Sequence, residues 1–138
     1  MRGLAGGRGL DRAGQLGDQW SLVILRDIAA YDRRGFRELL TGNAEGISAP
    51  VLSRRLADLT TAGLLVKSPT PRGKQGRYSL TELGIATLPL MVELARFGMA
   101  VDPSTADAQP DFVRTGDADE VATWQHVLRE RHLVTAER

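Results

Sequence analysis

The chain has 138 residues, which is enough for one domain with a core of ordinary size. Hydrophobic residues make up 42% of it, which excludes disorder throughout, and the absence of cysteine excludes disulfides, thiolate nucleophiles and thiol redox switches. The net charge of +1 is unevenly spread, because residues 46–80 carry six cations and one acid whereas residues 102–138 carry four cations and eight acids. A basic centre beside an acidic tail is typical of a protein with one phosphate-facing surface.

Other features that the sequence lacks restrict where the protein is expected to act and what chemistry it is expected to perform. No apolar run approaches the roughly 20 residues that span a bilayer, and the N-terminus lacks the apolar block of a secretory signal. We therefore expect a cytoplasmic protein without membrane contact. His126 and His132 are six residues apart, off the i, i+4 spacing of one helical face, so we expect surface histidines and no metal. Without a catalytic triad or a phosphate loop, we expect neither an enzyme nor a cofactor.

The first third of the chain predicts an arm followed by short helices. Residues 1–10 are too rich in glycine to hold a helix firmly and are interpreted as a flexible arm. A short helix is compatible with residues 11–16. Residues 19–30 are apolar on nearly every side and predict a buried helix. A brief extended piece at 35–37 then leads into a second short helix, about residues 37–42.

Residues 48–61 form the stretch around which the rest is organised. Ser48 is suited to cap a helix, Pro50 fits the first turn, and Gly63 supplies a left-handed end. The spacing i, i+4, i+7 predicts one buried stripe of Leu52, Leu56 and Leu59. The opposite face is small, polar and cationic and carries Ala49, Pro50, Ser53, Arg54 and Ala57.

This helix has the shape of one that reads DNA. A major groove admits one helix, and short residues near the helix N-terminus let the backbone approach base edges. The glycine-containing turn at 42–46 joins it to the preceding helix, as in a helix-turn-helix unit. An ordinary amphipathic helix with a solvated face is the alternative for this segment taken alone.

A basic hairpin is predicted directly after this helix. Residues 64–68 and 78–81 read as paired strands, and Pro69 and Pro71 prevent the first from continuing. The loop 72–77 between them carries three cations and two glycines, which suits approach to a groove. A solvated turn is the alternative for the loop by itself. Helix-turn-helix and hairpin together predict a winged helix-turn-helix domain over residues 11–101.

The remaining residues predict a long helix, a linker and a terminal helix. Thr81 can cap a helix from residue 82 to about 101, bent at Pro89, whose apolar surface is too large for a small domain to cover and indicates a partner subunit. Residues 102–116 are rich in Pro, Ala and Asp and read as a linker. Residues 117–138 hold a final helix with a buried stripe of Val121, Trp124 and Leu128. We therefore expect a mainly α fold with a small β-hairpin wing and with dimerisation helices at its N- and C-terminal ends.

A set of motifs occurs in a recognisable order along the chain. They are Trp20-Ser-Leu-Val-Ile-Leu-Arg-Asp27, Phe36-Arg-Glu-Leu-Leu40, Gly46-Ile-Ser48, Val51-Leu-Ser-Arg-Arg-Leu56, Ala62-Gly-Leu64 and Tyr78-Ser-Leu-Thr-Glu-Leu-Gly84. Together they resemble the HxlR family of bacterial winged-helix transcription regulators over residues 16 to about 100. The resemblance implies a homodimer, joined through the N-terminal helices and the long helix after the wing, with recognition helices in successive major grooves of a near-palindromic operator.

Three departures from the family pattern affect what is carried over. The segment Gly6-Gly-Arg-Gly9 stands where many relatives have a redox-sensing cysteine, so thiol sensing is not transferred. Ala49-Pro50 stands where relatives place a cation, so no operator sequence is borrowed. Lys74-Gln-Gly76 lengthens the wing and adds charge to it.

The sequence therefore predicts a dimeric, sequence-specific DNA-binding regulator, acting as a repressor. We expect Ser53 and Arg54 to face bases, and Arg55 and Lys67 to take phosphates. The full set of expected DNA-binding residues is Ser48, Ala49, Pro50, Ser53, Arg54, Arg55, Lys67, Arg72, Lys74 and Arg77, with the wing spanning 69–78. The alternative is a winged-helix protein-interaction module without DNA binding.

A small-molecule effector is a further hypothesis. Met91, Phe97 and Trp124 are candidates to line a cavity between the long helix and the C-terminal helix, with plain core packing as the alternative.

Overall fold

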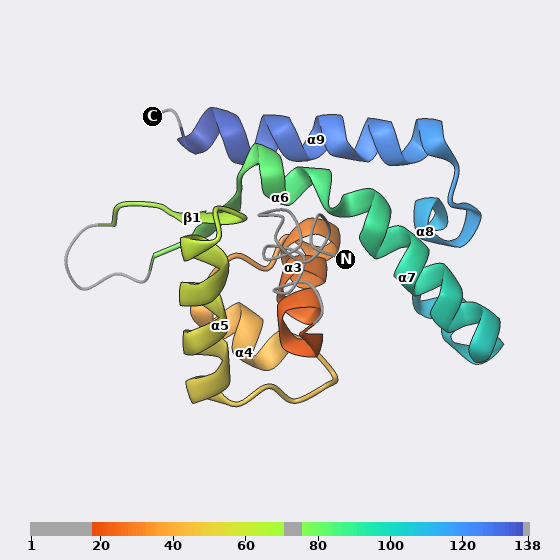
Figure 1. Cartoon of the computed structure of the whole chain (residues 1–138), viewed down its shortest axis with the longest axis horizontal. Helices are drawn as coiled ribbons and strands as arrows, with labels where there is room; N and C mark the ends of the chain where they lie inside the picture. Colours follow the sequence, from red (N-terminus) through yellow and green to blue (C-terminus); the bar gives the residue numbers. More distant parts are fainter. Residues whose placement is uncertain (1–17, 71–75, 137–138) are drawn as a thin grey trace, which may run out of the picture.

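The computed structural model describes residues 18–70 and 76–136 (Figure 1). This part of the chain is mainly helical with a two-stranded antiparallel hairpin, which confirms the predicted fold class. The predicted arm 1–10 and the short helix over 11–16 lie outside the described residues.

Helices α3 (Gln19–Tyr31), α4 (Phe36–Gly42) and α5 (Ala49–Thr61) form the helix-turn-helix part of the fold. Asp18 caps α3, where its carboxylate accepts a hydrogen bond from the Ser21 N–H at 3.1 Å. Aliphatic side chains from these helices and from the elements that follow fill one continuous core. Its most deeply buried members include Ile24, Leu25, Ile28, Leu39, Leu52, Leu56, Leu59, Leu65, Leu80 and Ile85.

Strand β1 (Leu65–Lys67) pairs with β2 (Tyr78–Leu80) in antiparallel register, with Leu65 opposite Leu80 and Lys67 opposite Tyr78. The outer edge of β2 meets the segment before α4, where Gly35 forms a bridge with Arg77. The extended piece predicted at 35–37 is confined to Gly35. Helix α4 already begins at Phe36, because the Glu38 carboxylate accepts the Gly35 N–H at 3.0 Å and so stabilises the first turn.

Two helices follow the hairpin where the sequence predicts one. They are α6 (Glu82–Ala86) and α7 (Leu88–Val101), and Thr87 lies at the break between the two helices. Pro89 has no N–H to donate to the Ile85 carbonyl one turn earlier. That carbonyl instead accepts a hydrogen bond from the Gln125 side chain at 3.1 Å. Proline therefore divides the helix, and the C-terminal helix supplies a donor at the break.

The segment 102–116, predicted as a linker, contains two short helices. They are η1 (Pro103–Ala108) and α8 (Asp111–Thr115), and both pack against α7. Val113 is buried in this contact. Composition rich in Pro, Ala and Asp suits short capped helices as well as an open linker, which is why the sequence does not distinguish them.

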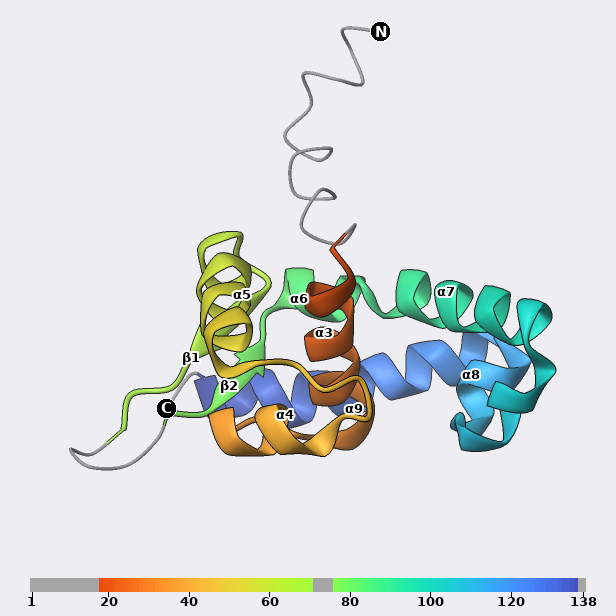
Figure 2. The same ribbon diagram turned by 90° about the horizontal axis from the view of Figure 1, so that it is seen from below.

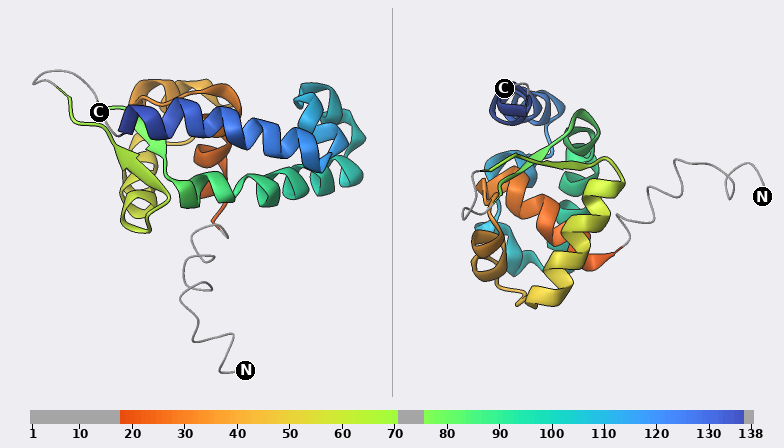
Figure 3. Two further views of the ribbon diagram at one scale, coloured as in Figure 1. Left: turned by 90° about the horizontal axis from the view of Figure 1, so that it is seen from above. Right: turned by 90° about the vertical axis from the view of Figure 1, so that its left-hand side faces the viewer.

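Helix α9 (Ala118–Ala136) runs back along the molecule and packs against α6 and β2 (Figures 1 and 3). The predicted stripe faces inward, since Val121 and Leu128 are buried. Trp124 donates its indole N–H to the Ala29 carbonyl at 3.0 Å and stacks on Phe112 with ring centroids 5.3 Å apart.

His132 corrects the prediction of two surface histidines. It is 0% exposed, and its Nδ1 accepts the Leu80 N–H at 2.9 Å, which ties α9 to strand β2. Burial, followed by the nearby Arg34 charge, lowers the pKa of His132 to about 4, so the imidazole is neutral at physiological pH. His126 is exposed, as predicted.

By length and composition alone, the segment Glu82–Val101 could cross a membrane, because its mean hydropathy is 1.4. Only 28% of its most apolar window is buried inside the protein. The prediction that no apolar run reaches this length is therefore wrong by that measure. The break at Thr87 interrupts the segment. Its large exposed side chains repeat at helical spacing along one face of α7, and we call this face the α7 apolar stripe: Leu90, Leu94, Phe97 and Val101.

Candidate nucleic-acid interface

Helix α5 begins and ends where the sequence predicts. Ser48 is its N-cap and accepts the Val51 N–H at 3.4 Å, and Gly63 follows the helix with a φ of +84°. The inward leucines are almost completely buried: Leu52, Leu56 and Leu59. This anchoring fixes which face of the helix points outward.

The outward face of α5 carries short side chains around one arginine. Ala49, Pro50, Ser53, Arg54 and Ala57 are all exposed. Within residues 18–70 and 76–136, the Arg54 guanidinium forms no ion pair or hydrogen bond. A guanidinium with all its donors available is the group that most often recognises guanine in a major groove.

Arg55 lies on the side of the helix and is paired with acids. Its Nε donates to the Asp18 carboxylate at 2.7 Å, and its Nη1 lies 3.4 Å from the Asp58 carboxylate. Burial opposes ionisation of Asp18, but hydrogen bonds from Arg55 and from the Ser21 N–H outweigh it and lower the pKa of Asp18. Arg55 thus joins α5 to the start of α3, a positioning role that the sequence did not reveal.

The turn between α4 and α5 is held by a second arginine that no sequence pattern marks. Arg26 on α3 binds both carboxylate oxygens of Glu45, at 2.7 and 3.1 Å. The hydrogen bond from Arg26 is the largest cause of the lowered pKa of Glu45. Within the turn, the Asn43 side chain accepts the Gly46 N–H at 2.8 Å, and Gly46 has a φ of +76°. These contacts set the angle between the two helices of the unit.

The hairpin lies beside α5 on the same side of the molecule (Figures 2 and 3). Lys67 is exposed, and its ammonium lies 5.8 Å from the centre of the Tyr78 ring. Its side chain crosses Gly76, where an added Cβ would lie 2.5 Å from Lys67 Cε. Arg77 is half exposed and 3.6 Å from Glu38. Two further predicted wing cations, Arg72 and Lys74, lie outside the described residues.

A buried arginine holds the base of the hairpin. Arg34 is 8% exposed, and its Nε donates to the Tyr78 carbonyl at 3.0 Å while its Nη2 donates to the Ser79 hydroxyl. The Arg34 carbonyl in turn accepts the Tyr78 N–H at 2.8 Å. Burial is the main cause of the lowered pKa of Arg34. This side chain fixes the hairpin against the helices, and no sequence pattern indicated it.

The three residues predicted to line an effector cavity do not come together. Met91 lines a cavity between α3 and α7, whereas Trp124 lies at a separate shallow hollow beside α8. Phe97 is 71% exposed. The prediction of one cavity shared by these three side chains is therefore wrong.

Three packed helices, the third with a small, cationic face turned outward, and a hairpin directly after them define a winged helix-turn-helix protein. The model of the HxlR-like helix-turn-helix family matches residues 15–105, and the chain belongs to this family. It is a DNA-binding transcription regulator and not an enzyme.

A solved structure supports the same fold. The crystal structure of PA1607, a candidate transcription factor, is similar with a TM-score of 0.61 and 29% sequence identity. The match covers 72% of this chain and 68% of that one. No curated protein matches the chain. Helices α8 and α9 lie beyond the residues that the family model matches.

Proposed function

We propose that the protein is a homodimeric cytoplasmic repressor that binds a near-palindromic operator through α5 and the hairpin wing. The observation that carries this proposal is the unpaired Arg54 among small residues on the outer face of α5. The buried leucines behind it prevent the helix from turning this face inward. Repression follows from steric exclusion when the operator overlaps a promoter.

The residues divide into three roles. Ser48, Ala49 and Pro50 let the N-terminal end of α5 approach the groove, and Ser53 and Arg54 contact base edges. The wing cations bind phosphate: Lys67, Arg72, Lys74 and Arg77. Arg55 contributes to phosphate binding less than these, because Asp18 and Asp58 already neutralise it.

We propose that a second copy of the chain covers the α7 apolar stripe. Phe97 and Val101 are each 71% exposed, and Leu90 and Leu94 are exposed at 46% and 45%. An uncovered stripe of this kind marks a contact surface. In a symmetric dimer the two α5 helices would reach half-sites about 34 Å apart, one turn of the duplex.

The dimer is tested with Phe97→Glu, which places a charge in the stripe. We expect the variant to be monomeric in light scattering and to bind DNA more weakly. Leu83→Glu replaces an exposed leucine outside the stripe and serves as the control. A dimer that survives Phe97→Glu with unchanged affinity would place the subunit contact elsewhere.

DNA binding is tested by fluorescence anisotropy with the duplex from upstream of the protein's own gene. Arg54→Ala should cost about 1–3 kcal/mol, roughly a 5- to 150-fold loss of affinity, and should relax base preference. Arg114→Ala, which removes an exposed arginine on α8, should leave affinity unchanged. With six to eight phosphate contacts across the dimer, the slope of log affinity against log salt should be roughly −5 to −7. A DNA affinity that changes neither with salt concentration nor in Arg54→Ala would refute the proposed interface.

A further inference from the structure

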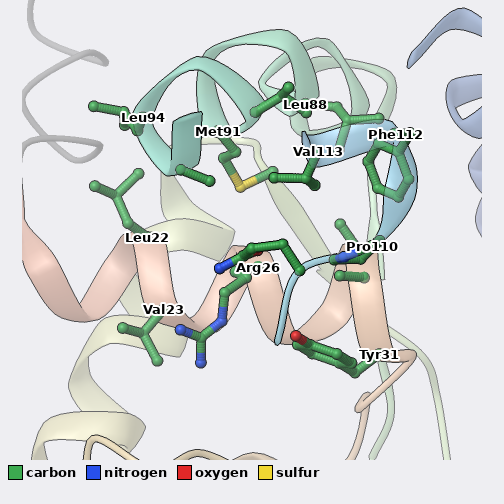
Figure 4. A pocket seen from close by; sticks show the side chains of 15 residues that line it. Leu22, Val23, Arg26, Tyr31, Leu88, Met91, Leu94, Pro110, Phe112 and Val113 are labelled. Carbon is green, nitrogen blue, oxygen red and sulfur yellow. The ribbon is translucent and has the colours of Figure 1, made fainter. Parts of the chain in front are cut away.

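A cavity of about 270 Å³ lies between α3, α7 and the segment 109–113 (Figure 4). Its walls are mostly apolar and include Leu22, Leu88, Met91, Ala95, Phe112 and Val113. The sulfur of Met91 points into the space, and Tyr31 and Pro110 lie on the opposite side from α7. An engineered aliphatic cavity of about 150 Å³ accepts benzene. This cavity therefore has room for a substituted aromatic ring.

The charges at the cavity favour an uncharged occupant. Arg26 is the cationic side chain in the lining, and its guanidinium lies between two carboxylates, 2.8 Å from Asp27 and 2.7 Å from Glu45. Four of its five N–H groups already have an acceptor in these carboxylates. An anion would be repelled by the Asp27 and Glu45 carboxylates, and a cation would be repelled by Arg26 itself. A neutral molecule with one acceptor oxygen meets neither penalty.

Arg26 also connects the cavity to the DNA-binding unit. Its stem lines the cavity, and its guanidinium holds Glu45 in the turn that leads into α5. The same helix α3 carries the N-cap Asp18, which binds Arg55 of α5. An occupant that draws the Arg26 guanidinium inward would loosen its hold on Glu45. The angle at which α5 meets DNA would then be less strictly fixed.

We propose that this cavity binds an uncharged one-ring aromatic molecule bearing a hydrogen-bond acceptor, and that its binding weakens DNA association through Arg26 and Glu45. The binding step stands on the cavity alone, whereas the effect on DNA rests on the proposed function. The ligand thus acts as an inducer, because it favours the form with the looser turn.

Binding is tested by NMR of the full chain labelled with ¹³C at the methionine methyl groups. Acetophenone, titrated into the millimolar range, should shift the Met91 signal and leave Met99, which is on the same helix outside the cavity, unchanged. Benzoate has nearly the same shape but carries a charge, and should shift Met91 at least tenfold less at equal concentration. Ala95→Phe should abolish the shift by filling the cavity, while Ala100→Phe on the same helix should retain it.

Three results would overturn the binding step. The first is a Met91 signal that acetophenone does not shift, and the second is an equal shift with acetophenone and with benzoate. The third is a Met91 signal that changes when the protein is diluted but not when acetophenone is added. The last result would mean that a second subunit fills the cavity. None of these measurements needs DNA, so they are independent of whether the proposed operator binding is correct.

The coupling is tested with Glu45→Gln, which keeps the length of the side chain but removes its charge. In the wild-type protein, saturating acetophenone should raise the Kd for the upstream duplex at least threefold. In Glu45→Gln the Met91 shift should persist, while the ratio of Kd values with and without acetophenone should fall close to one. An unchanged ratio in the variant, or no response in the wild type, would refute the route through Arg26. DNA binding without any ligand response would sink this inference and leave the proposed function intact.

Discussion

Replacing His132 with asparagine should remove a defined part of the pH dependence of stability. The imidazole accepts the Leu80 N–H and is completely buried, so its neutral form is the one that fits the folded protein. Burial lowers its pKa from 6.5 to about 4, with Arg34 and Arg131 adding to the shift and Asp32 opposing it. Asparagine can present an acceptor oxygen to the same N–H but does not titrate, so His132→Asn isolates the proton from the hydrogen bond.

The sign and size follow from proton linkage. Between about pH 6.5 and pH 4 the unfolded chain binds a proton at His132 and the folded chain does not, so stability falls as the pH falls through this window. The shift corresponds to about 3 kcal/mol of unfolding free energy, present in full above pH 6.5 and lost by about pH 4. All other ionisable groups are the same in both proteins. The difference between the two therefore reports His132.

The assay is urea unfolding at several pH values between about 7 and 4. The wild-type free energy of unfolding should drop about 3 kcal/mol more than that of His132→Asn over this interval. His126→Asn, which replaces the exposed histidine on the same helix, should behave like the wild type. If His132→Asn loses stability on acidification as steeply as the wild type does, the buried neutral imidazole is not the cause, and the contact between α9 and β2 is misassigned.

Three further substitutions test the packing that holds the DNA-binding unit. Gly84→Ala should cost about 1–3 kcal/mol in urea unfolding, because its Cβ would lie 2.3 Å from the Leu64 carbonyl oxygen. Gly98→Ala, where nothing lies within 4 Å of the added Cβ, should instead stabilise the protein by up to about 1 kcal/mol, and a loss there would contradict the helix at that point. Asp18→Asn keeps the helix cap but loses the ion pair with Arg55, so it should change the free energy of unfolding little near neutral pH but weaken DNA binding in anisotropy, because α5 is no longer held to the start of α3; unchanged or tighter DNA binding would argue against the positioning role of Arg55.

Local signals carried most of what the sequence could predict. The start and end of α5 follow from Ser48 and Gly63, each of which acts on the nearest turn of backbone, and the hairpin follows from two short stretches, 64–68 and 78–81, separated by prolines and glycines. The exposed face of α5 was predictable because the opposite face is a leucine stripe with one obvious destination.

Contacts between distant residues were not predictable in the same way. Arg26 and Glu45 are 19 residues apart and His132 lies 52 residues from Leu80, and neither pair has a spacing that marks it. Met91, Phe97 and Trp124 are predicted to meet only because of the helices that carry them, but α9 packs against α6 and β2, while the cavity lies between α7 and α3. Which helix faces which neighbour depends on the tertiary arrangement, and a single sequence does not encode that arrangement in a readable pattern.

The break at Thr87 has a geometric consequence for the operator. Helix α7 has 14 residues and is therefore about 21 Å long, and it leaves the DNA-binding unit at this joint. A tilt of about 10° there would swing the far end by about 4 Å, close to the 3.4 Å rise of one base-pair step. In the proposed dimer both subunits would bend alike at this joint, and the hydrogen bond from Gln125 to the Ile85 carbonyl would stiffen the joint and so help to fix the separation of the half-sites. Weakening it should let the protein tolerate operators one base pair longer or shorter.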